Sequence, residues 1–230
     1  MKTYPKESTP PINTSRRRFL RRAGVSAASV GLLATAACHK GEQIRVKPNK
    51  IDIGKGDMSV LNYAYALEQL EAGFYTQLIQ TPYSDITADE LALFTSIRDH
   101  EILHREFFKA ALGANAIPTL VTDFTTINFS DKISVLNAAK NFEDIGVLAY
   151  VGVSNQIQNK DYLTITGKIA SVEARHAALL SNMITPGSFS GTDQVDDIGL
   201  NKFLSISDVL YRTNGFLKTK VSAIYYDYQV

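Results

Sequence analysis

The chain has 230 residues, of which 45% are apolar and 20% charged, and its net charge is +1. This length fits one ordinary domain behind a short leader, and the composition is typical of a globular protein. The first 37 residues hold seven basic residues and one acidic residue, which is +6 and leaves −5 for the rest. A mildly acidic body gives no indication of a nucleic-acid partner. No apolar run is long enough to predict a membrane-spanning helix.

Residues 15–21 read SRRRFLR and resemble the bacterial twin-arginine export signal through the serine, Arg16, Arg17, the phenylalanine and the leucine. A mildly apolar stretch rich in Gly, Ala and Ser follows up to Ala37, which is the layout of a cleaved leader. The resemblance implies export by the twin-arginine machinery, a route known for carrying folded proteins, so the body would acquire its cofactor before export. The alternative for residues 1–37 is a basic amphipathic surface helix.

Cys38 is the only cysteine, which excludes an internal disulfide, and it stands where the apolar stretch ends. Its surroundings resemble a lipoprotein cleavage box, although Thr35 occupies a position where leucine is usual. The resemblance implies a lipidated Cys38 and a membrane contact through that lipid alone; the alternative is ordinary cleavage near Ala37. We expect residues 38–56, which are polar and interrupted by Pro and Gly, to be a tether. Either cleavage predicts a periplasmic or cell-envelope protein.

Helical periodicity dominates the remaining domain, residues 57–230. Thr87, with Glu90 three residues later, is a capping-box pattern, and Ser59 is a candidate cap for the preceding helix. The predicted helices span about 58–80, 87–112, 131–158, 161–184 and, near the C-terminus, 198–218.

The lengths of the connections predict the topology of an all-α four-helix bundle. Short links join the first helix to the second and the third to the fourth, so each pair should form an antiparallel hairpin. The stretch between the pairs, residues 113–130, reaches about 60 Å when extended, whereas a helix of this size is about 37 Å long. This connection can therefore cross the whole bundle, as in ferritin-like folds.

The second predicted hairpin repeats the first. Residues 61–75 (LNYAYALEQLEAGFY) align with 136–150 (LNAAKNFEDIGVLAY), and residues 97–108 (IRDHEILHREFF) align with 169–180 (IASVEARHAALL). Central polar residues coincide in this comparison: Glu68 with Glu143, Tyr75 with Tyr150, Glu101 with Glu173, and His104 with His176.

In each long helix a glutamate interrupts the apolar stripe near its midpoint. Helices of similar length bring these midpoints to one height, so we expect the glutamates to converge in the core. In two helices a histidine follows three residues later, on the same face. The chain has only nine glutamates and four histidines, which makes two chance Glu-x-x-His motifs improbable. The predicted metal ligands are Glu68, Glu101, His104, Glu143, Glu173 and His176.

Four carboxylates cannot all stay ionised in an apolar core, so either protons or cations must neutralise them. Two divalent ions cancel four negative charges and leave the imidazoles as neutral ligands. Mixed oxygen and nitrogen ligands suit iron or manganese, and the lack of thiolates argues against zinc–sulfur or iron–sulfur sites. The alternative is a metal-free bundle whose polar core is protonated or bridged by water.

Three further residues lie on the same helix faces as the predicted ligands, whereas His100 does not. Glu71 lies one turn beyond Glu68 and is either an extra ligand, a carboxylate that supports the ligands, or an ordinary polar interface residue. Tyr75 and Tyr150 either pack in the core, donate hydrogen bonds near the metals, or carry a radical. His100 points about 100° away from Glu101 around the helix, which predicts a surface residue.

The segments NYAYALEQLEAGFY, DHEILHREFF, NFEDIGVLAY and SVEARHAALL are similar to four helices of the ferritin-like domain family, which includes plant desiccation-related proteins. The resemblance covers about residues 57–184 and implies a ferritin-like fold with a carboxylate-bridged metal pair. Three functions stay open: an oxidoreductase acting on iron or peroxide in stress protection, a non-catalytic protein that sequesters metal or protects during drying, and a bundle without metal. The sequence identifies no surface that would set an oligomeric state.

Overall fold

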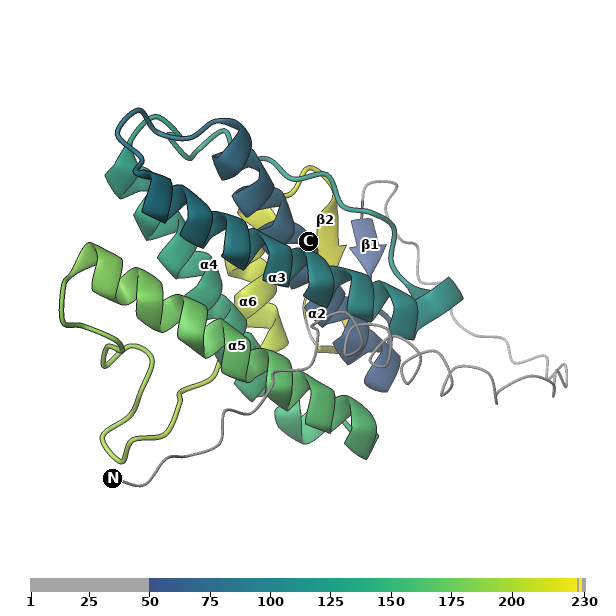
Figure 1. Cartoon of the computed structure of the whole chain (residues 1–230). Coiled ribbons are helices and arrows are strands. Elements are labelled where there is room, and N and C mark those ends of the chain that lie inside the picture. The colour runs from purple at the N-terminus through teal and green to yellow at the C-terminus, as the bar shows by residue number, and fades with distance from the viewer. Residues whose placement is uncertain (1–49, 227, 229–230) are drawn as a thin grey trace, which may run out of the picture. The chain divides into compact units, whose positions relative to one another are not determined.

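The computed structural model describes residues 50–226 and residue 228, and its body is a bundle of four long helices (Figure 1). Helix α2 packs against α3, α4 packs against α5, and α2 and α4 join the two pairs. The predicted all-α bundle of two hairpins joined by a long crossover is therefore confirmed. The bounds of the helices are α2 Asp57–Gln80, α3 Ala88–Leu112, α4 Lys132–Val153 and α5 Lys160–Ile184.

Side-chain caps explain where several helices begin. The Thr87 hydroxyl accepts a bond from the Glu90 amide at 3.1 Å, and the Glu90 carboxylate accepts one from the Thr87 amide at 3.0 Å, so the predicted capping box is confirmed. Helix α2 begins two residues before Ser59, which lies inside the helix and donates to the Gly56 carbonyl instead. The prediction of Ser59 as a cap was therefore wrong.

Helix α4 ends at Val153, earlier than predicted, and a short 3₁₀ turn follows at Ser154–Gln156. The backbone amides of Gln158 and Asn159 donate to the Asp57 carboxylate at 2.9 and 2.8 Å. These bonds tie the connection between α4 and α5 to the start of α2. They take up amides that a longer α4 would have used within the helix.

Two buried amide side chains of α2 fix the crossover along that helix. The Asn62 side-chain oxygen accepts a bond from the Ile117 amide at 2.9 Å, and the Gln69 side-chain oxygen accepts one from the Leu120 amide at 2.7 Å. Buried backbone amides need such partners, so the crossover follows α2 rather than a free path. Its Phe124 then packs edge to face on Phe74 of α2.

The two ends of the described chain meet in a small parallel sheet (Figure 1). Strand β1 (Lys50–Asp52) pairs with β2 (Lys220–Ser222), with Ile51 opposite Val221. Ile53, which follows β1, is buried. Residues 50–53 therefore belong to the folded domain and not to a tether, because β1 pairs with β2 and the Ile53 amide donates to the Ser222 carbonyl at 3.0 Å. The fifth helix, α6 (Ile206–Thr213), is shorter than predicted and packs on α4.

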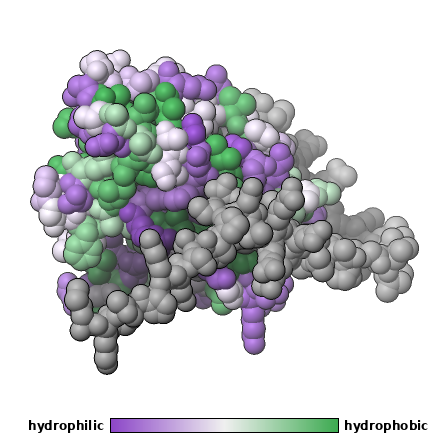
Figure 2. All heavy atoms as spheres, in the orientation of Figure 1, coloured by the Kyte–Doolittle hydropathy of each residue, from purple (hydrophilic) through white to green (hydrophobic). Residues whose placement is uncertain are grey.

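The loop after α5 carries much of the exposed apolar surface. In Figure 2, hydrophobic residues gather on the left of the visible face, where this loop lies in Figure 1. Its exposed apolar residues are Phe189, Ile198, Leu200 and Phe203. Within the described residues, every helix is too short or too polar to cross a lipid bilayer.

Candidate metal centre

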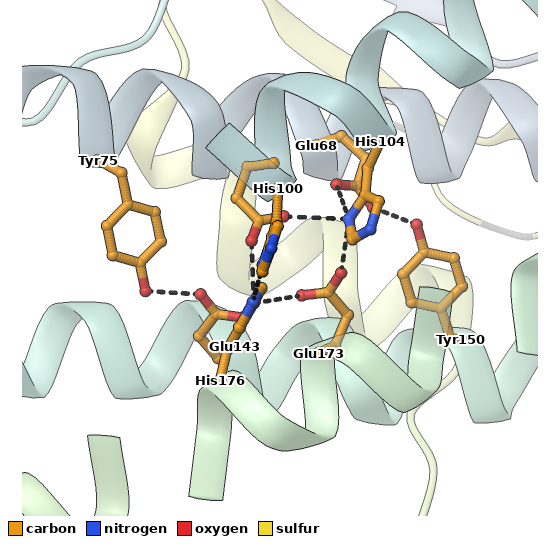
Figure 3. Close-up of polar contacts among 9 residues, drawn as sticks. Glu68, Tyr75, His100, His104, Glu143, Tyr150, Glu173 and His176 are labelled. Carbon is orange, nitrogen blue, oxygen red and sulfur yellow. Dashed lines mark hydrogen bonds and ion pairs between the residues drawn. The ribbon is translucent and has the colours of Figure 1, made fainter. Parts of the chain in front are cut away.

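The four helices bring all six predicted ligand residues into one buried cluster (Figure 3). Glu68 comes from α2, Glu101 and His104 from α3, Glu143 from α4, and Glu173 and His176 from α5. All four glutamates are fully buried. In α3 and α5 the spacing of three residues places the carboxylate and the imidazole one above the other on the face that points into the bundle.

One half of the cluster is centred on Nδ1 of His104. This nitrogen lies 2.9 Å from Glu173 Oε1 and 3.3 Å from one oxygen of each of Glu68 and Glu101. The ligand atoms of these four residues all lie within 4.8 Å of one another. Three carboxylate oxygens and one imidazole nitrogen thus converge on a single position.

The other half is centred on Nδ1 of His176. It lies 2.9 Å from Glu101 Oε1, 3.3 Å from Glu143 Oε2 and 3.5 Å from Glu173 Oε2. Its four ligand atoms meet the same 4.8 Å limit.

Glu101 and Glu173 belong to both halves. Glu101 turns Oε2 toward His104 and Oε1 toward His176, and Glu173 turns Oε1 toward His104 and Oε2 toward His176. Each of these carboxylates therefore spans the two positions with its two oxygens. Glu68 serves the His104 side alone and Glu143 serves the His176 side alone.

The polar atoms of the cluster outnumber the hydrogen bonds that could satisfy them. Buried atoms without a hydrogen-bond partner among the described residues include both oxygens of Glu101, both oxygens of Glu173, Glu68 Oε2 and His104 Nδ1. An imidazole N–H donates to one acceptor at a time, and buried unpaired oxygens are costly. A cation at each position would satisfy several oxygens together, so these residues fit a metal site, and the oxygen and nitrogen donors suit iron or manganese.

Without a cation, the cluster redistributes protons. Burial raises the pKa of Glu68 to about 8, and burial together with neighbouring carboxylates raises the pKa of Glu143. Burial lowers the pKa of the imidazoles, but the surrounding carboxylates outweigh it and raise the pKa of His176 to about 12 and that of His104 as well. Burial also opposes ionisation of Glu173, but the imidazoles of His104 and His176 close to its two oxygens lower its pKa to about 2.

The two tyrosines donate hydrogen bonds to the cluster rather than only packing in the core. Tyr75 on α2 donates to Glu143 Oε1 on α4 at 2.5 Å, and Tyr150 on α4 donates to Glu68 Oε1 on α2 (Figure 3). Each bond holds one oxygen of an outer glutamate and leaves the other turned toward a histidine.

Glu71 is buried next to the cluster but belongs to neither group of converging ligand atoms. Its Oε1 lies 3.1 Å from where a Cβ on Gly146 would stand, so the missing side chain of that glycine makes room for it. Burial and four neighbouring glutamates raise the pKa of Glu71 well above its usual value. This arrangement fits a protonated carboxylic acid beside the candidate ligands.

His100 is a contact that the sequence interpretation missed. Its ring is exposed, as predicted, yet Nδ1 lies 2.9 Å from Nε2 of His176 (Figure 3). Burial and His176 lower the pKa of His100. The available signal was the spacing of four residues from His104, which places both imidazoles on one side of α3.

Fold and cluster together define a ferritin-like helical bundle with a buried carboxylate–histidine cluster compatible with metal binding. The sequence signature described as a ferritin-like domain matches residues 56–186, more than half of the chain, so the chain belongs to the ferritin-like domain family. A comparison with curated proteins gives no match. Cys38, Arg16 and Arg17 lie outside the described residues, so lipidation and export remain predictions.

Proposed function

We propose that this protein holds two divalent ions, iron or manganese, between its four helices and uses them in redox chemistry with dioxygen or peroxide. One observation carries the proposal: Glu101 and Glu173 each turn one oxygen toward His104 and the other toward His176, so each contributes to both groups of ligand atoms. Two bridging carboxylates, two outer carboxylates and two imidazoles are the ligand set of di-iron and di-manganese proteins built on this fold.

The roles of the six residues follow from the contacts. Glu68 and His104 would hold one ion, Glu143 and His176 would hold the other, and the two shared glutamates would bridge them. Four carboxylates balance two divalent charges, so the filled site is neutral with neutral imidazoles. This neutrality makes complete burial of the cluster tolerable.

A bound pair of reduced ions supplies electrons to an oxygen-containing oxidant. The chain's own part is to keep water away and to hold the carboxylates in position. Tyr75 and Tyr150 hold one oxygen of each outer glutamate, and Glu71 places another carboxyl group within the electrostatic reach of the cluster. Removal of iron or peroxide in this way fits a role in protection against stress.

The proposal includes export. The twin-arginine-like leader supports delivery to the periplasm or cell envelope after folding, with the metal already bound, and Cys38 supports a lipid anchor. This part of the proposal depends on residues 15–38 alone and is independent of the geometry of the cluster.

Two measurements test the function. Elemental analysis of protein purified without added metal should find about two iron or manganese ions per chain. Protein loaded anaerobically with Fe(II) should consume dioxygen or peroxide on rapid mixing, with a change in near-ultraviolet and visible absorbance. Bound metal without oxidation would instead favour a sequestering or protective function, and protein that binds no metal would overturn the proposal.

A further inference from the structure

The ring of His100 lies end to end with that of His176. Nδ1 of His100 and Nε2 of His176 are 2.9 Å apart, the ring centroids are 5.2 Å apart, and the planes differ by 11°. The bonded nitrogens are much closer than the centroids, so the two rings are nearly coplanar and do not stack face to face. A single in-plane N–H···N hydrogen bond joins an exposed histidine of α3 to a buried histidine of α5.

The surroundings of His176 determine the direction of this bond. Its Nδ1 faces three carboxylate oxygens at 2.9, 3.3 and 3.5 Å. With a cation bound, Nδ1 gives its lone pair to the metal and the ring proton stays on Nε2. In the metal-bound state Nε2 of His176 therefore donates and Nδ1 of His100 accepts.

The other half of the cluster has no such partner. His104 faces its three carboxylates through Nδ1 in the same way, but residues 50–226 provide no hydrogen-bond partner for its Nε2. The internal repeat explains the difference, because the position that corresponds to His100 in the second hairpin holds Val172, which cannot accept a hydrogen bond. The two halves are therefore chemically unequal although their six ligand residues match.

We propose that His100 is a positioning residue, which orients His176 and makes the ion position beside His176 the tighter of the two. The inference rests on the proposed metal function and goes beyond it, since it predicts that the two ions bind in sequence. A ligand histidine held at its second nitrogen keeps its ring orientation and tautomer, and loss of such a partner typically lowers metal affinity roughly 10- to 100-fold.

Titration calorimetry of the metal-free protein with Mn(II) tests the order of binding. The wild type should bind two ions in separate steps. His100→Val, which copies Val172, should weaken the tighter step roughly 10- to 100-fold and leave the weaker step within about threefold. His100→Asn keeps an acceptor at a similar distance and should restore part of the loss. Asp99→Asn, next to His100 but paired with Arg98, should bind like the wild type.

A second readout needs no metal. Nitrogen NMR of labelled imidazoles in the metal-free protein should show a coupling across the bond between Nε2 of His176 and Nδ1 of His100. His100→Val should abolish the coupling while the circular dichroism spectrum and melting temperature stay close to those of the wild type.

The outcomes separate the inference from the function on which it rests. Two ions bound with one affinity, unchanged affinities in His100→Val, or no coupling between the rings of His100 and His176 would overturn the positioning role while the metal function stands. A wild type that binds no Mn(II) or Fe(II) would overturn both.

Discussion

The hydroxyl of Tyr75 donates a hydrogen bond of 2.5 Å to Oε1 of Glu143, a residue of the other hairpin. Its repeat counterpart, Tyr150, makes the reciprocal bond to Glu68. Each hairpin therefore orients the outer carboxylate of its partner. The other oxygen of each carboxylate faces a histidine, His176 for Glu143 and His104 for Glu68.

Removal of either tyrosine hydroxyl should destabilise the protein. Tyr75→Phe and Tyr150→Phe each leave a buried carboxylate oxygen without its donor, which should lower the free energy of unfolding by about 1–3 kcal/mol in urea denaturation of the metal-free protein. Tyr63→Phe is the matched control, because the buried hydroxyl of Tyr63, also on α2, has no hydrogen-bond partner among the described residues. Equal effects of Tyr63→Phe and Tyr75→Phe would show that the crossed bonds do not hold the glutamates.

Substitution of a shared glutamate and of an outer glutamate should leave different numbers of metal ions bound per chain. Glu101→Gln removes a charge from both positions and should leave close to no bound metal. Glu143→Gln removes a charge from one position and should leave about one ion per chain. Elemental analysis measures both, with Glu106→Gln, an exposed residue of α3 paired with Arg105, as the control. Loss of one ion in both variants would contradict the bridging role of Glu101.

The metal-free protein should lose stability as the pH rises. Glu68 has a pKa of about 8 in the folded state against an ordinary value of 4.5. A carboxyl group with such a raised pKa contributes its full stability below pH 4.5 and loses that contribution as the pH rises through about 8. The raised pKa values of His104 and His176 also make stability fall as the pH rises, beginning at about pH 6.5. The lowered pKa of Glu173 has the opposite effect, a loss of stability as the pH falls, but only between pH 4.5 and about pH 2.

We therefore expect the melting temperature in a chelator to fall by about 5 °C or more between pH 5 and pH 8. Saturating Mn(II) should remove most of the fall, because a bound cation replaces the protons. A melting temperature that stays level or rises over this range in the chelator would show that the buried carboxyl groups are not held in their protonated form.

Alanine substitution of two helical glycines can distinguish the space that Glu71 requires from the general cost of glycine in a helix. A methyl group added at Gly167 of α5 would meet open space, so Gly167→Ala should raise the free energy of unfolding by about 0.5–1 kcal/mol. Gly146→Ala would bring a methyl group to 3.1 Å from the Glu71 carboxylate and should give no gain or a loss. Denaturant unfolding of both variants makes the comparison, and equal gains would mean that Glu71 moves aside freely.

Export can be tested without reference to the cluster. Replacement of both Arg16 and Arg17 by lysine keeps the charge of the leader but removes the arginine pair of the resembled signal. The full-length protein should then stay in the cytoplasm, as judged by cell fractionation and immunoblotting. Normal export of this double variant would show that residues 15–21 do not act as a twin-arginine signal.

Helical periodicity and the internal repeat were sufficient to predict the bundle and the meeting of the six cluster residues. A glutamate at the middle of an apolar stripe must point into the bundle core with that stripe, and the repeat shows which glutamates correspond. The pairing of β1 with β2 was not predictable in this way, since two strands of three residues about 170 positions apart leave no local pattern.

The contact of His100 was missed for a different physical reason. The sequence defines the direction of His100 only relative to residues of the same helix, such as Glu101, whereas the contact with His176 depends on how closely α5 approaches α3. Similarly, the spacing of Tyr75 and Tyr150 placed them on the right face, but only the separation between α2 and α4 determines whether their hydroxyls reach a carboxylate.

The crossed tyrosine bonds also bear on how this protein arose. One hairpin carries an outer glutamate, one Glu-x-x-His pair and one tyrosine, so it contains half a cluster and needs a copy of itself for the rest. A twofold dimer of half-length ancestors, later fused in tandem, would produce this arrangement. After such a fusion the two copies could diverge separately, and His100 opposite Val172 and Glu71 opposite Gly146 are two positions at the cluster where they differ.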